Sequence, residues 1–178
     1  MLNRILLYTL LLGLSGGLFQ CSTFRELSIP TQTRTGTDGN RSGDDASARL
    51  RQNVVDYALR QKGARYQYAG RSPRSGFDCS GFTHYVFDAF DVSLTPVSRV
   101  QETEGKRVDL EDVRAGDLVF FRKSRGGSVF HVALVVRRRP GELTVVHSTS
   151  SRGVISENIY DSSYWRTKIM SARDVLSR

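Results

Sequence analysis

The sequence is poor in residues that bind metals or form disulfides. It has only two cysteines, Cys21 and Cys79, and three histidines among 178 residues. No two of these residues stand at the close spacing that protein zinc sites use, so we expect no metal and no other cofactor. The two cysteines allow one disulfide at most, and that bond would tie the N-terminal segment to the rest of the chain.

Acidic residues are scarce relative to basic ones. The chain has 26 Lys and Arg against 18 Asp and Glu, which gives a formal net charge of +8 at pH 7. Such a protein is drawn to anionic surfaces, among which are peptidoglycan and lipid phosphates. No nucleic-acid-binding motif occurs, so nucleic acid is not an expected partner. The basic run Arg137 to Arg139 precedes Pro140-Gly141 and is typical of a solvated hairpin turn.

Long hydrophobic runs are confined to the N-terminus. The apolar segment over 5–18 follows Arg4 and is too short to span a bilayer comfortably. We interpret residues 1–20 as a signal peptide, with a retained membrane anchor as the alternative.

Cys21 directly follows this segment, and its position resembles that of the cysteine in bacterial lipoprotein signals. There the thiol is acylated, with chains such as palmitate, and becomes the new N-terminus; here Gln20 replaces the small residue usual before it. Residues 21–46 lack apolar periodicity and are predicted to be a flexible tether behind the lipidated Cys21. Lipidation would leave Cys79 unpaired, and an unpaired cysteine in an exported protein is a candidate reactive thiol.

The domain predicted over 47–178 has helical periodicity first and strand periodicity afterwards. This order predicts an α+β fold with an antiparallel sheet. Helices are expected over 47–62 and from about Cys79 to Phe90, with a helical turn in the connector 96–105. Strands are expected over 117–121, 130–136 and 143–147, with a short edge strand at 154–155 and a tail, 164–176, that closes over the sheet.

Three residues have the chemistry and the placement of a thiol-nucleophile site. Cys79 opens a helix, where the peptide dipoles lower the pKa of a thiol, and a histidine within hydrogen-bond reach would lower it further. His131 lies in an apolar strand and is the candidate base, and His147, at the end of the next strand, would orient it. A buried inert cysteine and core or surface histidines are the alternatives. His84, five residues after Cys79, points away from the thiol and is expected at the surface.

Several ordered motifs resemble the NlpC/p-sixty family of cell-wall cysteine peptidases. They are Gly63-Ala64-Arg65-Tyr66-Gln67-Tyr68-Ala69-Gly70, Gly76-Phe77-Asp78-Cys79-Ser80-Gly81-Phe82, Arg114-Ala115-Gly116-Asp117-Leu118-Val119-Phe120-Phe121, His131-Val132-Ala133-Leu134 and Val146-His147-Ser148. The closest resemblance is to single-domain, lipid-anchored murein endopeptidases of Gram-negative cells. One departure is Ala69-Gly70, where the family usually has two glycines.

The resemblance implies a pared-down papain-like fold and hydrolysis of amide bonds in peptidoglycan stem peptides. It implies that Cys79, His131 and His147 are catalytic, and that Tyr66 assists the oxyanion or the substrate. Asp78 and Ser80 match positions that hold the free amine of the stem peptide in some members, while the residues alone predict that Asp78 is a helix cap.

We expect the protein to be located in the cell envelope, as a monomeric outer-membrane lipoprotein that faces the periplasm. A peptidoglycan-binding lipoprotein without turnover and a thioester-based acyltransferase are the alternative functions.

Overall fold

The computed structural model describes residues 38–177 of the chain. The predicted signal peptide, Cys21 and the tether as far as residue 37 lie outside these residues and stay predictions. Within the described part, no helix is both long enough and apolar enough to cross a membrane.

The first helix, α1 (Asp38–Leu59), begins earlier than the predicted start at residue 47. The part of the predicted tether over 38–46 is therefore helical. The side chains of residues 41–49 are exposed, so this stretch carries no apolar stripe that periodicity could detect. Farther along α1, Val54 and Ala58 stand four residues apart and are fully buried, and Leu50 packs at the edge of the core.

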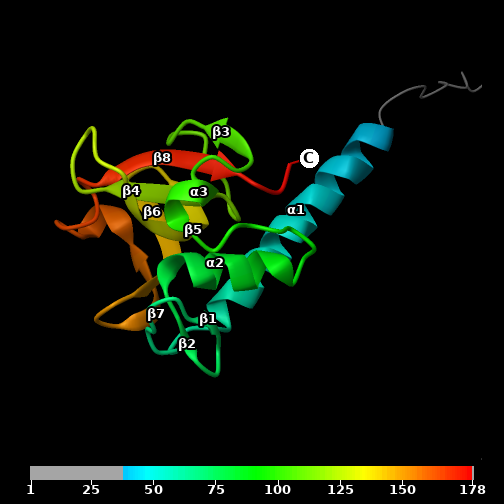
Figure 1. The fold of residues 1–178 in the computed structure, drawn as a ribbon. Helices are drawn as coiled ribbons and strands as arrows, with labels where there is room; N and C mark the ends of the chain where they lie inside the picture. Colours follow the sequence, from blue (N-terminus) through cyan, green and yellow to red (C-terminus); the bar gives the residue numbers. More distant parts are fainter. Residues whose placement is uncertain (1–37, 178) are drawn as a thin grey trace, which may run out of the picture. The chain divides into compact units, whose positions relative to one another are not determined.

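Six strands form one antiparallel sheet in the order β3-β8-β4-β5-β6-β7. The four predicted strands are β4 to β7, and β7 lies at the edge as expected. The tail closes over the sheet only in part: Trp165 packs on one face, whereas its strand β8 is part of the sheet, between β3 and β4 (Figure 1). The bounds are β3 (Lys106–Val108), β4 (Leu118–Arg122), β5 (Val129–Arg139), β6 (Glu142–Thr149), β7 (Gly153–Asn158) and β8 (Ile169–Asp174).

Short elements complete the domain. The loop predicted between the first two helices contains a small hairpin of β1 (Arg71–Ser72) and β2 (Gly76–Phe77). The second helix, α2 (Cys79–Asp88), begins at the predicted residue, and α3 (Ser98–Gln101) is the helical turn expected in the connector. A 3-10 turn, η1 (Ile159–Asp161), follows β7.

Helices and sheet enclose two apolar clusters, one on each face of the sheet. On the face covered by α1 and α2, Phe82 and Phe87 of α2 share a cluster with Val132 and Leu134 of β5. On the other face, Ala133 of β5 belongs to a second cluster with Trp165 and Ile159. Successive side chains of a strand point to opposite faces, so β5 contributes to both cores and must be apolar along most of its length.

The start of α2 packs so closely on the preceding loop that only glycine fits there. A Cβ on Gly81 would lie 2.0 Å from the carbonyl oxygen of Gly70. Ala69, in the same loop, has φ of 55°, a left-handed conformation that glycine adopts more readily. The alanine that departs from the family pattern therefore holds a backbone conformation that costs free energy.

A buried ion network joins α1 to the sheet. Nη1 of Arg51 lies 2.7 Å from Oδ1 of Asp117, and its Nη2 lies 2.5 Å from Oδ2 of Asp174 on β8. All three side chains are buried. Burial raises the pKa of Asp117, whereas hydrogen bonds from Ser177 and the charge of Arg51 outweigh burial and hold the pKa of Asp174 below its usual range.

Replacing Arg51 by methionine should destabilise the domain strongly. The variant Arg51→Met keeps most of the buried side-chain volume but leaves two buried carboxylates without their shared cation, which costs about 3–5 kcal/mol in the free energy of unfolding. Urea unfolding followed by circular dichroism measures this loss. Arg49→Met, on the exposed part of α1, is the matched control and should change stability by less than about 0.5 kcal/mol. Equal stability of the two variants would contradict the role given to Arg51.

Candidate active site

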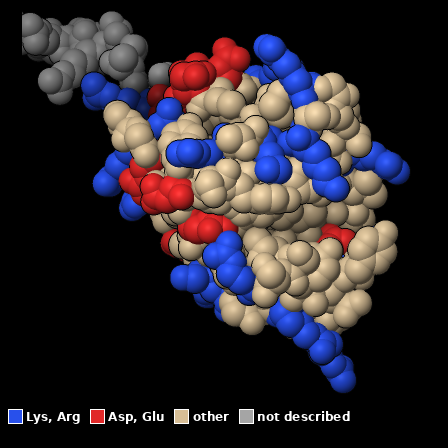
Figure 2. Space-filling view, turned by 90° about the vertical axis from the view of Figure 1, so that its left-hand side faces the viewer, with Lys and Arg blue, Asp and Glu red and all other residues tan. Residues whose placement is uncertain are grey.

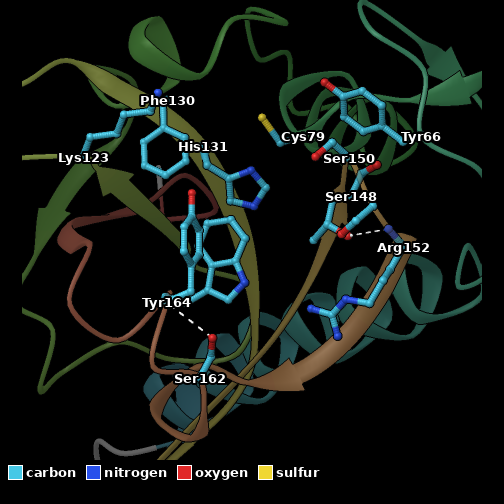
Figure 3. Close-up of a pocket in the computed structure, with 13 residues that line it drawn as sticks. Tyr66, Cys79, Lys123, Phe130, His131, Ser148, Ser150, Arg152, Ser162 and Tyr164 are labelled. Carbon is cyan, nitrogen blue, oxygen red and sulfur yellow. Dashed lines mark hydrogen bonds between the residues drawn. The ribbon is translucent and has the colours of Figure 1, made fainter.

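The candidate site lies where β5 and β6 separate. Their pairing begins at Leu134 and Val146 and does not extend to His131, although β6 stays paired with β7 as far as Thr149. A cavity of about 540 Å³ opens at this separation (Figure 3). Its walls are formed by Tyr66, Cys79, Lys123, Phe130, His131, Ser148, Thr149, Ser150, Ser151, Arg152, Ser162, Tyr164 and Trp165.

Cys79 reaches this cavity as the first residue of α2. Its thiol is free and half-buried. The hydroxyl of Ser148 on β6 donates to the carbonyl oxygen of Phe77 over 2.7 Å, which ties the segment before Cys79 to the separated strand. This bond holds the start of α2 next to the end of β6.

Asp78 acts as the N-cap of α2, as the residues alone predicted. Its Oδ1 accepts from the backbone N–H of Gly81 at 2.6 Å, and its Oδ2 accepts from the N–H of Ala69 at 2.9 Å. Ser80 is buried, and its hydroxyl is within bonding distance of Asp78 and of the Pro96 carbonyl. Neither Asp78 nor Ser80 is among the residues that line the cavity, so their contact with substrate stays a prediction.

Tyr66 lies across the cavity from His131, with its hydroxyl directed to the side where Cys79 lies (Figure 3). Its backbone bridges to Phe77, directly before the N-cap of α2. Burial raises the pKa of the Tyr66 phenol, and the nearby Cys79 and Asp78 raise it further. The phenol therefore keeps its proton at neutral pH and can donate a hydrogen bond into the cavity.

His131 and His147 form a hydrogen-bonded pair across the gap between the strands. Nε2 of His131 lies 2.9 Å from Nδ1 of His147, and both imidazoles are buried. His131 lines the cavity, whereas His147 lies behind it. Cys79 and His131 thus line one cavity, and His147 is hydrogen-bonded to His131 without lining it.

Trp165 covers the histidine pair. Its ring stacks on His131 with centroids 4.6 Å apart and lies 5.3 Å from the ring of His147. Phe130 stacks on the other part of the indole at 6.2 Å. The sequence placed Trp165 only within the tail 164–176; its contact with the imidazoles depends on the path of the tail, which periodicity does not reveal.

The electrostatics favour the neutral forms of both the Cys79 thiol and the His131 imidazole. Burial raises the pKa of the Cys79 thiol to about 11, although the backbone N–H groups of Val132 and Ser80 lower it. Burial and then the charge of His147 hold the pKa of His131 well below its ordinary value. The expected lowering of the thiol pKa is therefore wrong for this structure, because burial outweighs the helix start. No hydrogen bond joins Cys79 to His131 in the described part of the chain.

Two residues that the sequence did not point to extend the histidine pair. Oε1 of Glu157 on β7 lies 3.0 Å from Nε2 of His147, and Nη2 of Arg152 lies 2.7 Å from the same oxygen. The hydrogen bond from His147 lowers the pKa of Glu157 to about 2 against the effect of burial, and Arg152 adds to this. The register pairs His147 with Ile155, so Glu157 is its diagonal neighbour; only the strand pairing reveals this.

The remaining histidine does not join the site. His84 is half-buried rather than at the surface, and its Nδ1 lies 2.7 Å from the carbonyl oxygen of Leu94. It is not among the residues around the cavity. Over residues 38–177, no group of three or more His, Cys, Asp or Glu side chains could hold a metal ion.

Comparison with known proteins identifies the family of the chain. The model of the NlpC/P60 family matches residues 63–174. The chain is 38% identical over 133 residues to the gamma-DL-glutamyl hydrolase of Bacillus subtilis, covering 74% of this chain and 30% of that protein. It is 35% identical over 130 residues to the murein DD-endopeptidase MepS/murein LD-carboxypeptidase of Escherichia coli, covering 72% and 65%.

Solved structures give the same result for the fold. An NlpC/P60 family protein from Bacillus cereus superposes with a TM-score of 0.65 at 31% identity, over 71% of this chain and 40% of that one. The NlpC/p60 domain of the peptidoglycan hydrolase SagA gives a TM-score of 0.58 at 28% identity, over 70% and 97%. The α+β, papain-like fold expected from the sequence is confirmed. With its free thiol at a helix start beside a buried histidine pair, the chain belongs to the NlpC/P60 family of cysteine peptidases.

Proposed function

We propose that this protein hydrolyses amide bonds of peptidoglycan stem peptides or their cross-links, with Cys79 as the nucleophile. The observation that carries the proposal is the meeting of Cys79 and His131 in one open cavity, with His147 hydrogen-bonded behind His131. A thiol, a base and a group that orients the base are what acyl transfer through a thioester requires.

The reaction proceeds in two halves. As Sγ of Cys79 attacks the amide carbon, its proton passes to His131, which then gives that proton to the departing amine. The C–N bond breaks and a thioester remains. Water attacks the thioester with His131 as base, and the carboxylic product leaves as the thiol is restored. The hydroxyl of Tyr66 and the backbone N–H of Cys79 are the proposed donors to the oxyanion.

Because the thiol is buried, we place the proton transfer from Cys79 to His131 after substrate has bound. With the pKa of Cys79 at about 11 and the pKa of His131 well below its ordinary value, the free enzyme holds a neutral pair. The transfer becomes favourable when the attacked carbonyl develops charge that the oxyanion donors stabilise. This neutral resting state also keeps the thiol from reacting with other electrophiles.

The charge at the cavity fits a substrate that carries carboxylates. Lys123 and Arg152 line the cavity and no Asp or Glu does. Arg152 is paired with Glu157, whereas Lys123 makes no ion pair within residues 38–177 and lies over the ring of Phe130. Stem peptides bear free carboxylates, and relatives of this chain are named for acting on murein.

Basic side chains also stand around much of the face that Figure 2 shows. Together with the net charge of +8, they favour contact with an anionic polymer such as peptidoglycan. We extend the proposal to the cell envelope, with residues 1–20 as signal peptide and a lipid on Cys21 that anchors a monomeric enzyme to the outer membrane.

Replacing the nucleophile should abolish the release of soluble peptides from purified sacculi. Loss of Cys79 in Cys79→Ala removes the thioester route, which lowers the rate by on the order of 10⁶-fold. Mass spectrometry of fragments released by the full chain measures this and shows which bond is cleaved. Ser93→Ala, at an exposed position outside the cavity, should release peptides like the parent. Equal release by Cys79→Ala would refute the proposal, and acylated products without peptide fragments would indicate an acyltransferase.

Activity should persist below the pH at which an ordinary histidine is protonated. Because the pKa of His131 lies well below its ordinary value of 6.5, its base form survives as the pH falls through that value. The acid limb of kcat/KM should therefore lie below about pH 6.5. A pH profile on a defined muropeptide measures it, and an acid limb above that pH would contradict the neutral pair.

Removing the unpaired cation of the cavity should weaken substrate binding. Lys123→Gln should raise KM for a muropeptide with free carboxylates by about 2- to 5-fold, since an exposed charge contact contributes up to about 1 kcal/mol. Added salt should reduce the difference in KM between Lys123→Gln and the parent, because salt screens the charge contact. Lys62→Gln, at an exposed position away from the cavity, is the matched control, and an equal KM for the two variants would exclude a role for Lys123.

A further inference from the structure

Four side chains form one continuous line from the cavity to the sheet edge. His131 on β5 bonds to His147 on β6 at 2.9 Å, His147 bonds to Glu157 on β7 at 3.0 Å, and Glu157 bonds to Arg152 at 2.7 Å. His147 uses one ring nitrogen, Nδ1, for the bond to His131 and the other, Nε2, for the bond to Glu157. The proton positions in the line are therefore linked to one another.

The carboxylate of Glu157 decides where the proton of His147 lies. Its pKa of about 2 keeps Glu157 ionised at neutral pH, and an ionised carboxylate only accepts hydrogen bonds. Nε2 of His147 must therefore carry a hydrogen. Burial lowers the pKa of His147, although Glu157 opposes this, so the ring is neutral and its Nδ1 has no hydrogen.

The same reasoning passes on to His131. Because Nδ1 of His147 is an acceptor, Nε2 of His131 must donate across the 2.9 Å contact. His131 is itself neutral, so its single ring hydrogen is used there and Nδ1 is bare. A bare nitrogen is what a base requires, and His131 lines the cavity that Cys79 also lines.

We propose that Glu157 is a positioning residue that fixes the tautomers of both histidines and leaves Nδ1 of His131 free to take the proton of Cys79. The opposite arrangement, with the hydrogen of His147 on Nδ1, would place the hydrogen of His131 on Nδ1 and block proton acceptance. Glu157 excludes it, because a bare Nε2 on His147 would face the carboxylate without a hydrogen between them.

Arg152 holds the carboxylate in place. Its guanidinium lies on the same oxygen that His147 contacts, so this oxygen is fixed from two sides. The ionisable groups that face Glu157 are His147 from β6 and Arg152 from the turn between β6 and β7. Burial lowers the pKa of His147, Glu157 raises it and Arg152 lowers it, and the balance is a pKa below the ordinary value, so His147 is neutral at neutral pH.

The first test reads the tautomers directly. This inference rests on the proposed function for its consequence, but the tautomers can be measured without any substrate. In the full chain labelled with 15N-histidine, two-bond 1H–15N spectra should show Nε2–H and bare Nδ1 for both His131 and His147 near pH 7. Protonation of Nδ1 on either ring would overturn the proposal, whether or not the protein cleaves peptidoglycan.

The second test removes the charge of Glu157. A Gln side chain can donate as well as accept, so Glu157→Gln permits the blocked tautomers. We expect kcat on a defined muropeptide to fall by about 10- to 100-fold, as for other groups that fix a histidine tautomer from behind. The acid limb of kcat/KM should also move to lower pH, because the lost anion no longer stabilises the protonated form of the line.

The matched control is Glu142→Gln. Glu142 is likewise a strand glutamate, paired with Arg137 and bonded to Thr144, but it lies at the far end of β6. It should retain the kcat, the pH profile and the histidine tautomers of the parent. A Glu157→Gln enzyme with the parent's kcat and acid limb would overturn the proposal. If Glu157→Gln fails to fold, the spectra of the parent protein still decide.

Discussion

The hydrogen bond between His131 and His147 is the constraint on which the site depends. It spans the gap where β5 and β6 cease to pair, so it replaces backbone pairing with a side-chain contact and leaves room for a cavity. Both rings are buried under Trp165. A buried imidazole needs hydrogen-bond partners for its nitrogens. Trp165 buries the ring of His147, and the register of β6 and β7 places Glu157 where it can bond to Nε2 of that ring.

The thiol is brought to that gap by a second set of contacts. The cap by Asp78, the close approach of Gly81 to Gly70 and the bond from Ser148 to Phe77 fix the start of α2. Two of them are local in the sequence, whereas the bond from Ser148 comes from β6, and only Asp78 adds a charge near the sulfur. The result is a thiol that is held in position but neutral. Its deprotonation therefore requires the proposed base, His131, and the bound substrate.

Much of the fold could be predicted from the sequence because most elements carry their own periodicity. The apolar run of β5, the apolar spacing of Val54 and Ala58, and the turn at Pro140-Gly141 each depend on neighbours in the chain. The exceptions are elements whose partners are distant. β8 contains Ser171 and Asp174, whose burial is offset by Glu102 and Arg51, and the exposed start of α1 has no apolar face at all.

The sequence by itself determined the family, the cysteine at a helix start and the two strand histidines, because each can be recognised from residue types that lie close together in the sequence. Only the tertiary structure decided the electrostatics: that burial raises rather than lowers the pKa of Cys79, and that Glu157 stands behind His147. Burial is a property of the packed domain, and a diagonal contact between strands exists only in one register. Neither the burial of Cys79 nor the contact between Glu157 and His147 exists until the sheet has formed.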